Sequence, residues 1–170
     1  MELVPGTPLY RGWAWYKQES LPAVLFRDTS ASRHGRWGGT AGALFLCQTV
    51  DHARLYARKF APHAVGTYET EAPLSLLDLR TEDVLLKAVK PIPTAKLPVG
   101  FQHDTEDTVR MFAGSRDTQT MLEPLCCLAA EFHGKDGFVR TVWADSARLD
   151  EVCVCGAGQR KVRLVKHEPC

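Results

Sequence analysis

The sequence predicts an α+β fold in a single domain built on antiparallel sheet, and three observations predict it. The chain has 170 residues, which suits one domain with a core of its own. Strand-like segments lie near both ends of the chain, and helix-like segments lie between them. The sequence holds no repeats, low-complexity tracts or linker-like runs. We therefore expect one domain that spans residues 1–170.

The first half of the chain is expected to hold four strands and one helix. Its strand segments are rich in β-branched, aromatic and other apolar residues. Pro8 stands where a strand begins and no backbone donor is needed. Ala53, Tyr56 and Ala57 recur at helical spacing after Asp51. The expected strands are residues 7–13, 43–47, 64–72 and 74–79, and the expected helix is residues 50–60.

The second half is expected to alternate helices with strands. Thr81 precedes two acidic residues, which is typical of a helix start, and Pro91 marks the end of that helix. Apolar residues then recur every 3.6 positions over residues 118–133, and Gly134 is suited to end that helix in the left-handed conformation. The proline-rich stretch between these helices, residues 91–116, is predicted as a loop. The expected strands are residues 138–143, 150–155 and 162–165.

A basic, glycine-rich stretch at residues 33–42 leads into the apolar segment that begins at Ala43. Its glycines permit a close approach of the backbone to a ligand. The planar guanidinium groups of Arg33 and Arg36 suit phosphate contact, and Trp37 offers a flat face for an aromatic base. The stretch therefore indicates a nucleotide-binding loop. The alternative is a plain connection into a core strand, with both arginines solvated.

Metal-ligating residues occur without the spacing of a known metal motif. The six cysteines do not form the paired pattern of a zinc ribbon, and most lie in apolar runs, so we expect buried free thiols and no metal. A second group within residues 103–107 carries one histidine and three acids. A solvated loop is the simpler explanation for that group than a metal site.

Charge and hydropathy exclude some functions and compartments. A formal net charge of +1 argues against an extensive nucleic-acid interface. No apolar run approaches the roughly 20 residues of a membrane span. The first residues lack the basic and apolar regions of a signal peptide. We expect an intracellular, cytoplasmic protein without a membrane partner.

Three landmarks, in this order along the chain, resemble the ADP-ribosyltransferase-like superfamily. The first is Tyr10-Arg11-Gly12, which is similar to the first-strand motif of that family. The second is the apolar segment Gly42–Cys47 together with Ala53-x-x-Tyr56-Ala57. The third is Asp150-Glu151-Val152 with Gln159-x-x-x-Arg163-Leu164, which resembles the strand that carries the catalytic glutamate. The resemblance implies a split β-sheet with flanking helices that binds NAD+ in a cleft.

The resemblance also implies roles for individual residues. Glu151 would stabilise the positive charge that develops on the ribose carbon when NAD+ is cleaved, and Arg11 would pair with phosphate or ribose oxygens. Both are the expected catalytic residues. The alternatives are a strand-edge carboxylate for Glu151 and a structural ion pair for Arg11. Residues expected to contact NAD+ are Arg11, Gly12, Arg36, Trp37, Gly42, Phe45, Thr49 and Tyr56.

The expected activity is mono-ADP-ribosyl transfer from NAD+ to a macromolecular acceptor, with release of nicotinamide. Two alternatives remain open. The loop Gly35-Arg36-Trp37 resembles the RES toxin domain, a related fold that degrades NAD+ by hydrolysis or phosphorolysis, but that family's helix glutamate corresponds here to Tyr56. In the ADP-ribosyltransferase-like superfamily the second motif carries a tyrosine or serine, which is replaced here by Phe45, Cys47 or Thr49, depending on the alignment. These departures favour the second alternative, a nucleotide- or protein-binding module without catalysis.

Overall fold

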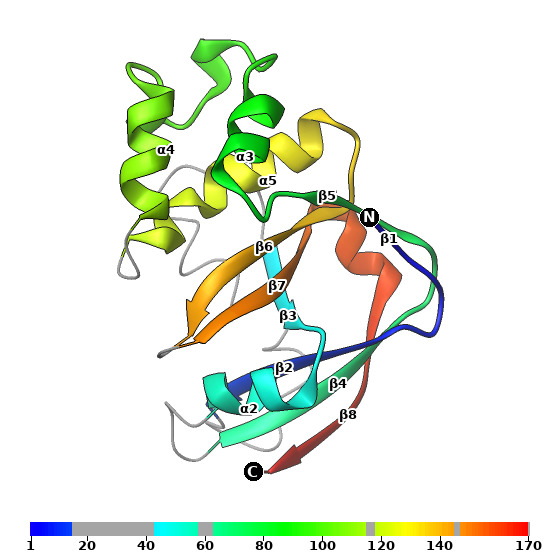
Figure 1. The fold of residues 1–170 in the computed structure, drawn as a ribbon. Helices are drawn as coiled ribbons and strands as arrows, with labels where there is room; N and C mark the ends of the chain where they lie inside the picture. The colour runs from blue at the N-terminus through cyan, green and yellow to red at the C-terminus, as the bar shows by residue number, and fades with distance from the viewer. Residues whose placement is uncertain (15–42, 58–62, 115–117, 145–146, 170) are drawn as a thin grey trace.

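The computed structural model describes residues 1–14, 43–57, 63–114, 118–144 and 147–169 (Figure 1). Its strands are β1 (Glu2–Leu3), β2 (Pro8–Ala14), β3 (Ala43–Cys47), β4 (His63–Thr70), β5 (Leu74–Asp78), β6 (Gly137–Ala144), β7 (Ala147–Cys155) and β8 (Val162–Pro169). Its α-helices are α2 (Val50–Ala57), α3 (Glu82–Val89), α4 (Thr105–Ala113) and α5 (Glu123–Phe132). Short 3₁₀ turns are η3 (Thr94–Lys96), η4 (Val99–Phe101), η5 (Gln119–Leu122) and η6 (Gly156–Lys161).

The strands form one sheet in the order β1-β5-β6-β7-β3-β2-β4-β8. The α+β class is confirmed, although the sheet is mixed because β5 pairs with β6 in parallel. Parallel neighbours need a long crossover connection. Here α3, α4 and α5 supply that crossover, and they form the helical layer at the top of Figure 1.

The sheet divides between β3 and β2. Within the described residues, these strands share a single register pair, Tyr10 opposite Cys47. By contrast, β2 pairs with β4 along its whole length, and β3 pairs with β7 along its whole length. The two halves of the sheet cross at a steep angle in Figure 1. One half is therefore β1-β5-β6-β7-β3, and the other is β2-β4-β8.

Alternating side chains place a different apolar core on each face. Leu9 and Tyr68 from one half meet Val139 and Val152 from the other half in a core enclosed between the two halves. The other face of β3, β6 and β7 packs against α3, α4 and α5 around Leu125. On the other half, α2 covers β2 and β4 through Ala53. Burial of apolar area in these cores is the main stabilising contribution to the fold.

Two predicted helix ends are confirmed in detail. The Thr81 hydroxyl accepts a hydrogen bond from the Val84 backbone N–H and so caps α3. Gly134 adopts a φ of 63°, the left-handed conformation expected after α5. The helix expected over residues 118–133 is shorter, because residues 119–122 form the 3₁₀ turn η5 and α5 begins at Glu123 with Pro124 in its first turn.

The prediction of a loop over residues 91–116 is wrong. This stretch contains the helix α4. The Asp104 carboxylate caps its N-terminus by accepting a hydrogen bond from the Asp107 backbone N–H at 3.2 Å. Two acids of the group that begins at His103 thus stand in the first turn of a helix, where the helix dipole favours them. The apolar stripe of α4 is short, with Val109 as its buried position, so its periodicity is hard to detect.

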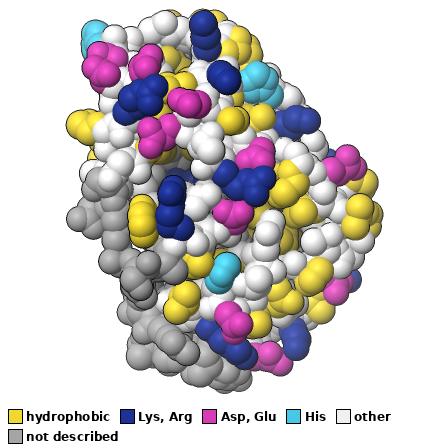
Figure 2. Space-filling model, in the orientation of Figure 1, with side chains coloured by type: hydrophobic (Ala, Val, Ile, Leu, Met, Phe, Trp, Pro, Cys, Tyr) yellow, Lys and Arg dark blue, Asp and Glu magenta, His cyan; other side chains and the backbone are white. Residues whose placement is uncertain are grey.

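Charged side chains of both signs are interspersed on the face seen in Figure 2. No large area of that face carries a single sign, which agrees with the near-neutral net charge. Among the helices described, none is long and apolar enough to cross a lipid bilayer.

Leu125 tests the packing between the helices and the sheet, because its side chain is fully buried. Leu125→Ala is expected to lower the free energy of unfolding by about 2–5 kcal/mol, the range for a buried leucine that leaves a cavity. Urea denaturation measures the change. Met111→Ala on α4 is the control, since its exposed side chain should cost less than about 0.5 kcal/mol. Equal losses in both variants would contradict the assigned core.

Candidate functional site

Four polar or functional side chains lie in a row across the sheet. Cross-strand pairs place Arg140 of β6 opposite Glu151 of β7, Glu151 opposite Cys47 of β3, and Cys47 opposite Tyr10 of β2. Directly opposed residues point to the same face of a sheet. The row therefore crosses the division between the two halves and connects residues of all three sequence landmarks with Arg140.

Arg140 holds two buried carboxylates. Its Nη2 donates to Glu123 Oε1 at 2.7 Å and to Glu151 Oε2 at 2.9 Å, and its Nε donates to the same Glu151 oxygen at 3.1 Å. The exposed fractions of these side chains are 7% for Arg140, 4% for Glu123 and 11% for Glu151. Burial alone would lower the pKa of Arg140, but the two carboxylates outweigh burial and raise it. Arg140 therefore keeps its charge in the interior, with two carboxyl groups within hydrogen-bond distance of it.

Phe45 and Cys47 line the same side of β3. The Arg140 guanidinium lies 5.9 Å from the centre of the Phe45 ring, a cation–π contact. Burial, together with the charge of Glu151, raises the pKa of the Cys47 thiol to about 12. Cys47 is thus a neutral thiol at physiological pH. Phe45 is partly buried and contacts the cation of the ion cluster.

Arg11 lies on the opposite face from Glu151. Side chains alternate along a strand, so Tyr10 shares the face of Cys47 and Arg11 shares the face of Leu9. Arg11 is half-buried, and its charge acts on both Cys47 and Tyr68. The structure therefore brings Arg11 into electrostatic range of Cys47, but it does not place Arg11 and Glu151 on one face of the sheet.

The carboxylate of β7 that shares the face of Arg11 is Asp150. The Thr141 hydroxyl donates to Asp150 Oδ1 at 2.9 Å, and Arg80 Nη1 lies 3.5 Å from Asp150 Oδ2. Arg80 also holds Asp78, and this hydrogen bond lowers the pKa of that carboxyl. Asp150 is partly exposed, unlike Glu151. Because side chains alternate along a strand, the sequence itself indicates that Asp150 and Glu151 point to opposite faces of β7. The motif comparison does not take this alternation into account.

A pocket of about 330 Å³ opens at the edge of β6, beyond the point where β5 ends. Its walls include Arg80, Arg140, Thr141 and Trp143. The pocket therefore adjoins both the ion cluster of Arg140 and the ion pairs of Arg80. The Gln119 side chain donates to the Trp143 carbonyl oxygen and accepts from the Trp143 N–H, which satisfies the strand edge there. Ligands of open α/β sheets commonly bind at the carboxyl ends of parallel strands, where this pocket lies.

Arginines dominate the charge of the pocket wall. Besides Arg80 and Arg140, Arg110 and Arg148 line it, and the Arg148 guanidinium stacks 5.4 Å from the centre of the Trp143 ring. Arg110 is paired with three acids of α3 and α4. The wall offers cationic and aromatic groups in one place, which suits an anionic ligand with an aromatic ring.

The other predicted NAD+ contacts divide into two groups. Gly12 lies on β2 opposite Val65, and Thr49 accepts a hydrogen bond from the His52 N–H at the start of α2. Tyr56 belongs to α2, which packs against β2. Arg36, Trp37, Gly42 and the rest of the basic loop at residues 33–42 lie outside the described residues, as does the predicted continuation of the helix to residue 60.

Sequence reasoning missed Arg140, Glu123 and Asp150 as parts of the site. Arg140 carries a detectable signal, because a cation inside the apolar run at residues 138–143 must be paired or face a cavity. The same argument applies to Arg11, which interrupts the apolar run of β2. Glu123 gives no such signal, since an acid at a helix start is commonplace.

Comparison with known proteins identifies a shared fold. No protein-family profile matches the sequence, and no curated protein matches it significantly. The structure is similar to a chain in the crystal structure of the M. tuberculosis MbcT–MbcA toxin–antitoxin complex, with a TM-score of 0.51 and 15% sequence identity. The match covers 99% of this chain and 86% of the other chain. The protein therefore has the fold of that chain along its whole length.

Removal of Arg140 tests the buried ion cluster. Arg140→Met leaves two carboxylates buried without a cation and is expected to cost about 3–5 kcal/mol of stability. The unpaired carboxylates would then have folded-state pKa values above their unfolded values, so the folded variant would bind more protons than the unfolded one. Its loss of stability should therefore be smaller at pH 5 than at pH 8.

Urea denaturation at the two pH values measures both effects. Arg148→Met is the control, because Arg148 is exposed and contacts only the pocket wall. A pH-independent loss in Arg140→Met would contradict the buried, ionised cluster.

Proposed function

We propose that the protein is an enzyme that consumes NAD+ by cleaving the bond between nicotinamide and ribose. The observation that carries this proposal is the fold, which matches a chain of a toxin–antitoxin complex over 99% of the present chain. The three sequence landmarks that resemble the ADP-ribosyltransferase-like superfamily add support. They fall on β2, on β3 with α2, and on β7, which are neighbours in or against the sheet.

Acidic and basic side chains of the described residues could serve that reaction. Cleavage develops positive charge on the ribose carbon, and a fixed carboxylate stabilises it. Two acids on β7 are candidates: Glu151, which Arg140 holds through hydrogen bonds, and Asp150, which shares the face of Arg11 and accepts a hydrogen bond from the pocket residue Thr141. Arg11 supplies a cation for the phosphates, and the arginine-lined pocket is a second place for the anionic part of NAD+.

The fate of ADP-ribose distinguishes two reactions. The loop Gly35-Arg36-Trp37, which resembles the NAD+-degrading RES toxin domain, and the match with a chain of a toxin–antitoxin complex together favour depletion of NAD+, by hydrolysis or phosphorolysis. The acidic motif Asp150-Glu151-Val152 on β7 instead favours transfer of ADP-ribose to a macromolecular acceptor. We place NAD+ depletion first, because the fold match spans the whole chain while the motif spans three residues.

Incubation of the purified protein with NAD+ separates the possible functions. Free ADP-ribose would indicate hydrolysis, and phosphorylated ADP-ribose formed only in phosphate buffer would indicate phosphorolysis. Label retained on protein or nucleic acid would indicate transfer. Absence of nicotinamide release under all these conditions, in protein that is folded by circular dichroism, would sink the enzymatic proposal and leave a binding module.

The two acids of β7 are compared by amide substitution. Replacement of the acid that stabilises the transition state should slow nicotinamide release by roughly 10²–10³-fold. The KM for NAD+ should change little, because the interaction is strongest in the transition state. We expect this result for Glu151→Gln, and Asp150→Asn is the direct comparison.

Glu123→Gln is the matched control, because Glu123 contacts the same guanidinium from α5. An equal loss of activity in Glu123→Gln and Glu151→Gln would show that Glu151 acts only through Arg140. A loss confined to Asp150→Asn would assign the role to Asp150.

Arg11 is expected to bind NAD+ rather than to take part in bond cleavage. Arg11→Lys keeps the charge but removes the planar fork, so the KM should rise while kcat stays close to that of the unaltered protein. Steady-state kinetics measure the change, and Arg163→Lys on the exposed side of β8 is the control. If Arg11→Lys unfolds instead, Arg11 is a structural cation and the assignment is wrong.

A further inference from the structure

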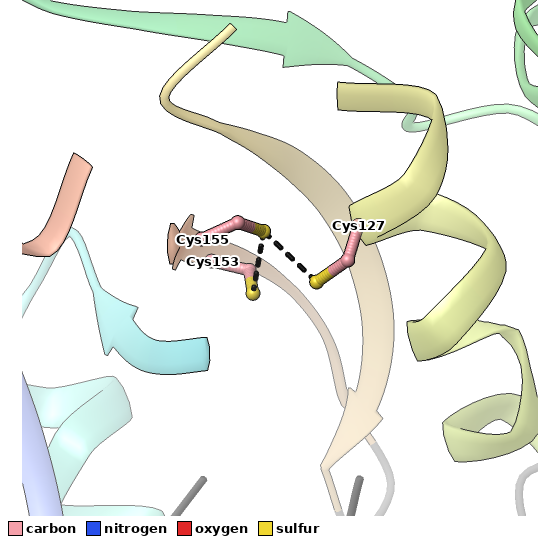
Figure 3. Close-up of side chains that lie close together, drawn as sticks. All are labelled: Cys127, Cys153 and Cys155. Carbon is pink, nitrogen blue, oxygen red and sulfur yellow. Dashed lines mark hydrogen bonds between the residues drawn. The ribbon is translucent and has the colours of Figure 1, made fainter. Parts of the chain in front are cut away.

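Three cysteine sulfurs converge where α5 packs on β7 (Figure 3). Cys153 and Cys155 stand two residues apart on β7 and so point to the same face, and Cys127 of α5 points at them. The Sγ atoms lie 2.9 Å apart for Cys127 and Cys155 and 3.9 Å apart for Cys153 and Cys155. All three sulfurs lie within 4.8 Å of one another, and all three residues are buried.

This arrangement has the dimensions of a metal site. Sulfurs bound at about 2.3 Å to one tetrahedral zinc ion stand roughly 3.8 Å from one another. The Cys153–Cys155 separation has that value already. The 2.9 Å contact between Cys127 and Cys155 would need to open by about 1 Å, which is a side-chain adjustment. Thiolate sulfur is also the ligand that thiophilic ions such as Zn²⁺ and Cu⁺ prefer.

A carboxylate lies at the rim of the cluster. Glu131 follows Cys127 by four residues on α5, so both side chains are on one face of the helix. Its Oε1 lies 3.6 Å from the position that a Cβ atom on Gly156 would occupy, beside Cys155. Burial and the nearby Cys127 raise the pKa of Glu131. This exposed acid lies one helical turn from Cys127 and could supply a fourth donor if its side chain turned toward the sulfurs.

We propose that Cys127, Cys153 and Cys155 bind one thiophilic metal ion, Zn²⁺ or Cu⁺, between the helical layer and the sheet. A Zn²⁺ ion would take Glu131 as its fourth ligand, and a Cu⁺ ion would need only the three sulfurs. Binding releases the thiol protons to solvent as the thiolates coordinate the ion. Because protons compete with the ion for the sulfurs, metal affinity falls as the pH is lowered.

Titration of the full-length, reduced, chelator-treated protein tests the proposal. Zn²⁺ and Cu⁺ are each added in competition with a chromophoric chelator. We expect one ion per chain at saturation and a rise in the thermal unfolding midpoint with the bound ion. Co²⁺ in place of Zn²⁺ should give the sulfur-to-cobalt absorption band of a thiolate site, which reports ligation independently of stability.

Matched variants assign the ligands. Cys153→Ser and Cys155→Ser should weaken binding by more than the roughly 10–100-fold that loss of an outer-shell partner costs, and should abolish the cobalt band. Cys126→Ser is the control, because Cys126 is buried next to Cys127 on α5 and is not part of the cluster. Glu131→Gln should weaken the binding of Zn²⁺, which would use Glu131 as a ligand. It should leave the binding of Cu⁺ unchanged.

Two results would overturn the proposal. One is an equal metal affinity in the unaltered protein and in the Cys153→Ser variant. The other is a reduced protein that takes up no ion and on exposure to oxygen loses two hydrogens in mass spectrometry, which would assign Cys127 and Cys155 to a disulfide. Unchanged circular dichroism in the serine variants excludes misfolding as the cause of lost binding.

Discussion

The paired charge of Arg140 is the interaction on which the arrangement of the site depends. A guanidinium in the interior carries a desolvation cost of several kcal/mol, and it is offset only when its partners are fixed around it. Glu123 reaches it from α5 and Glu151 from β7, so one cation joins the helical layer to the sheet. The same cation forms part of the pocket wall. The Arg140 side chain therefore both joins α5 to β7 and faces the pocket.

Strand alternation decides which groups can act together. Adjacent residues on β7 project to opposite faces, so Glu151 belongs to the ion cluster and Asp150 to the face of Arg11. Fixation by hydrogen bonds favours a preorganised group, and exposure to solvent favours a group that can touch a substrate. These two requirements fall on neighbouring acids, which is why paired amide substitutions distinguish their roles better than either substitution alone.

The sequence predicted local structure better than long-range structure. Capping by Thr81, the left-handed Gly134 and the apolar strand at Ala43 depend on neighbouring residues, and all three are found in the structure. The helix α4 was missed because its buried stripe is short and prolines precede it.

The candidate site was only partly predictable. Motif order identified β2, β3 and β7, but the pairing of Arg140 with Glu123 joins residues of two elements whose contact no local pattern encodes. The convergence of three cysteines from α5 and β7 was hidden for the same reason.

The narrow junction between β3 and β2 has a consequence for temperature. Where strands pair along their length, backbone hydrogen bonds fix their relative position, but these two strands share one register pair in the part of the chain described. The core between the halves of the sheet, with Leu9 and Tyr68 on one side and Val152 on the other, must hold them instead. Apolar association weakens on cooling. The position of β2, with Arg11, relative to β7 should therefore loosen in the cold before the helices or the β6–β7 hairpin are affected, which would make the junction between the two halves the cold-sensitive part of the described structure.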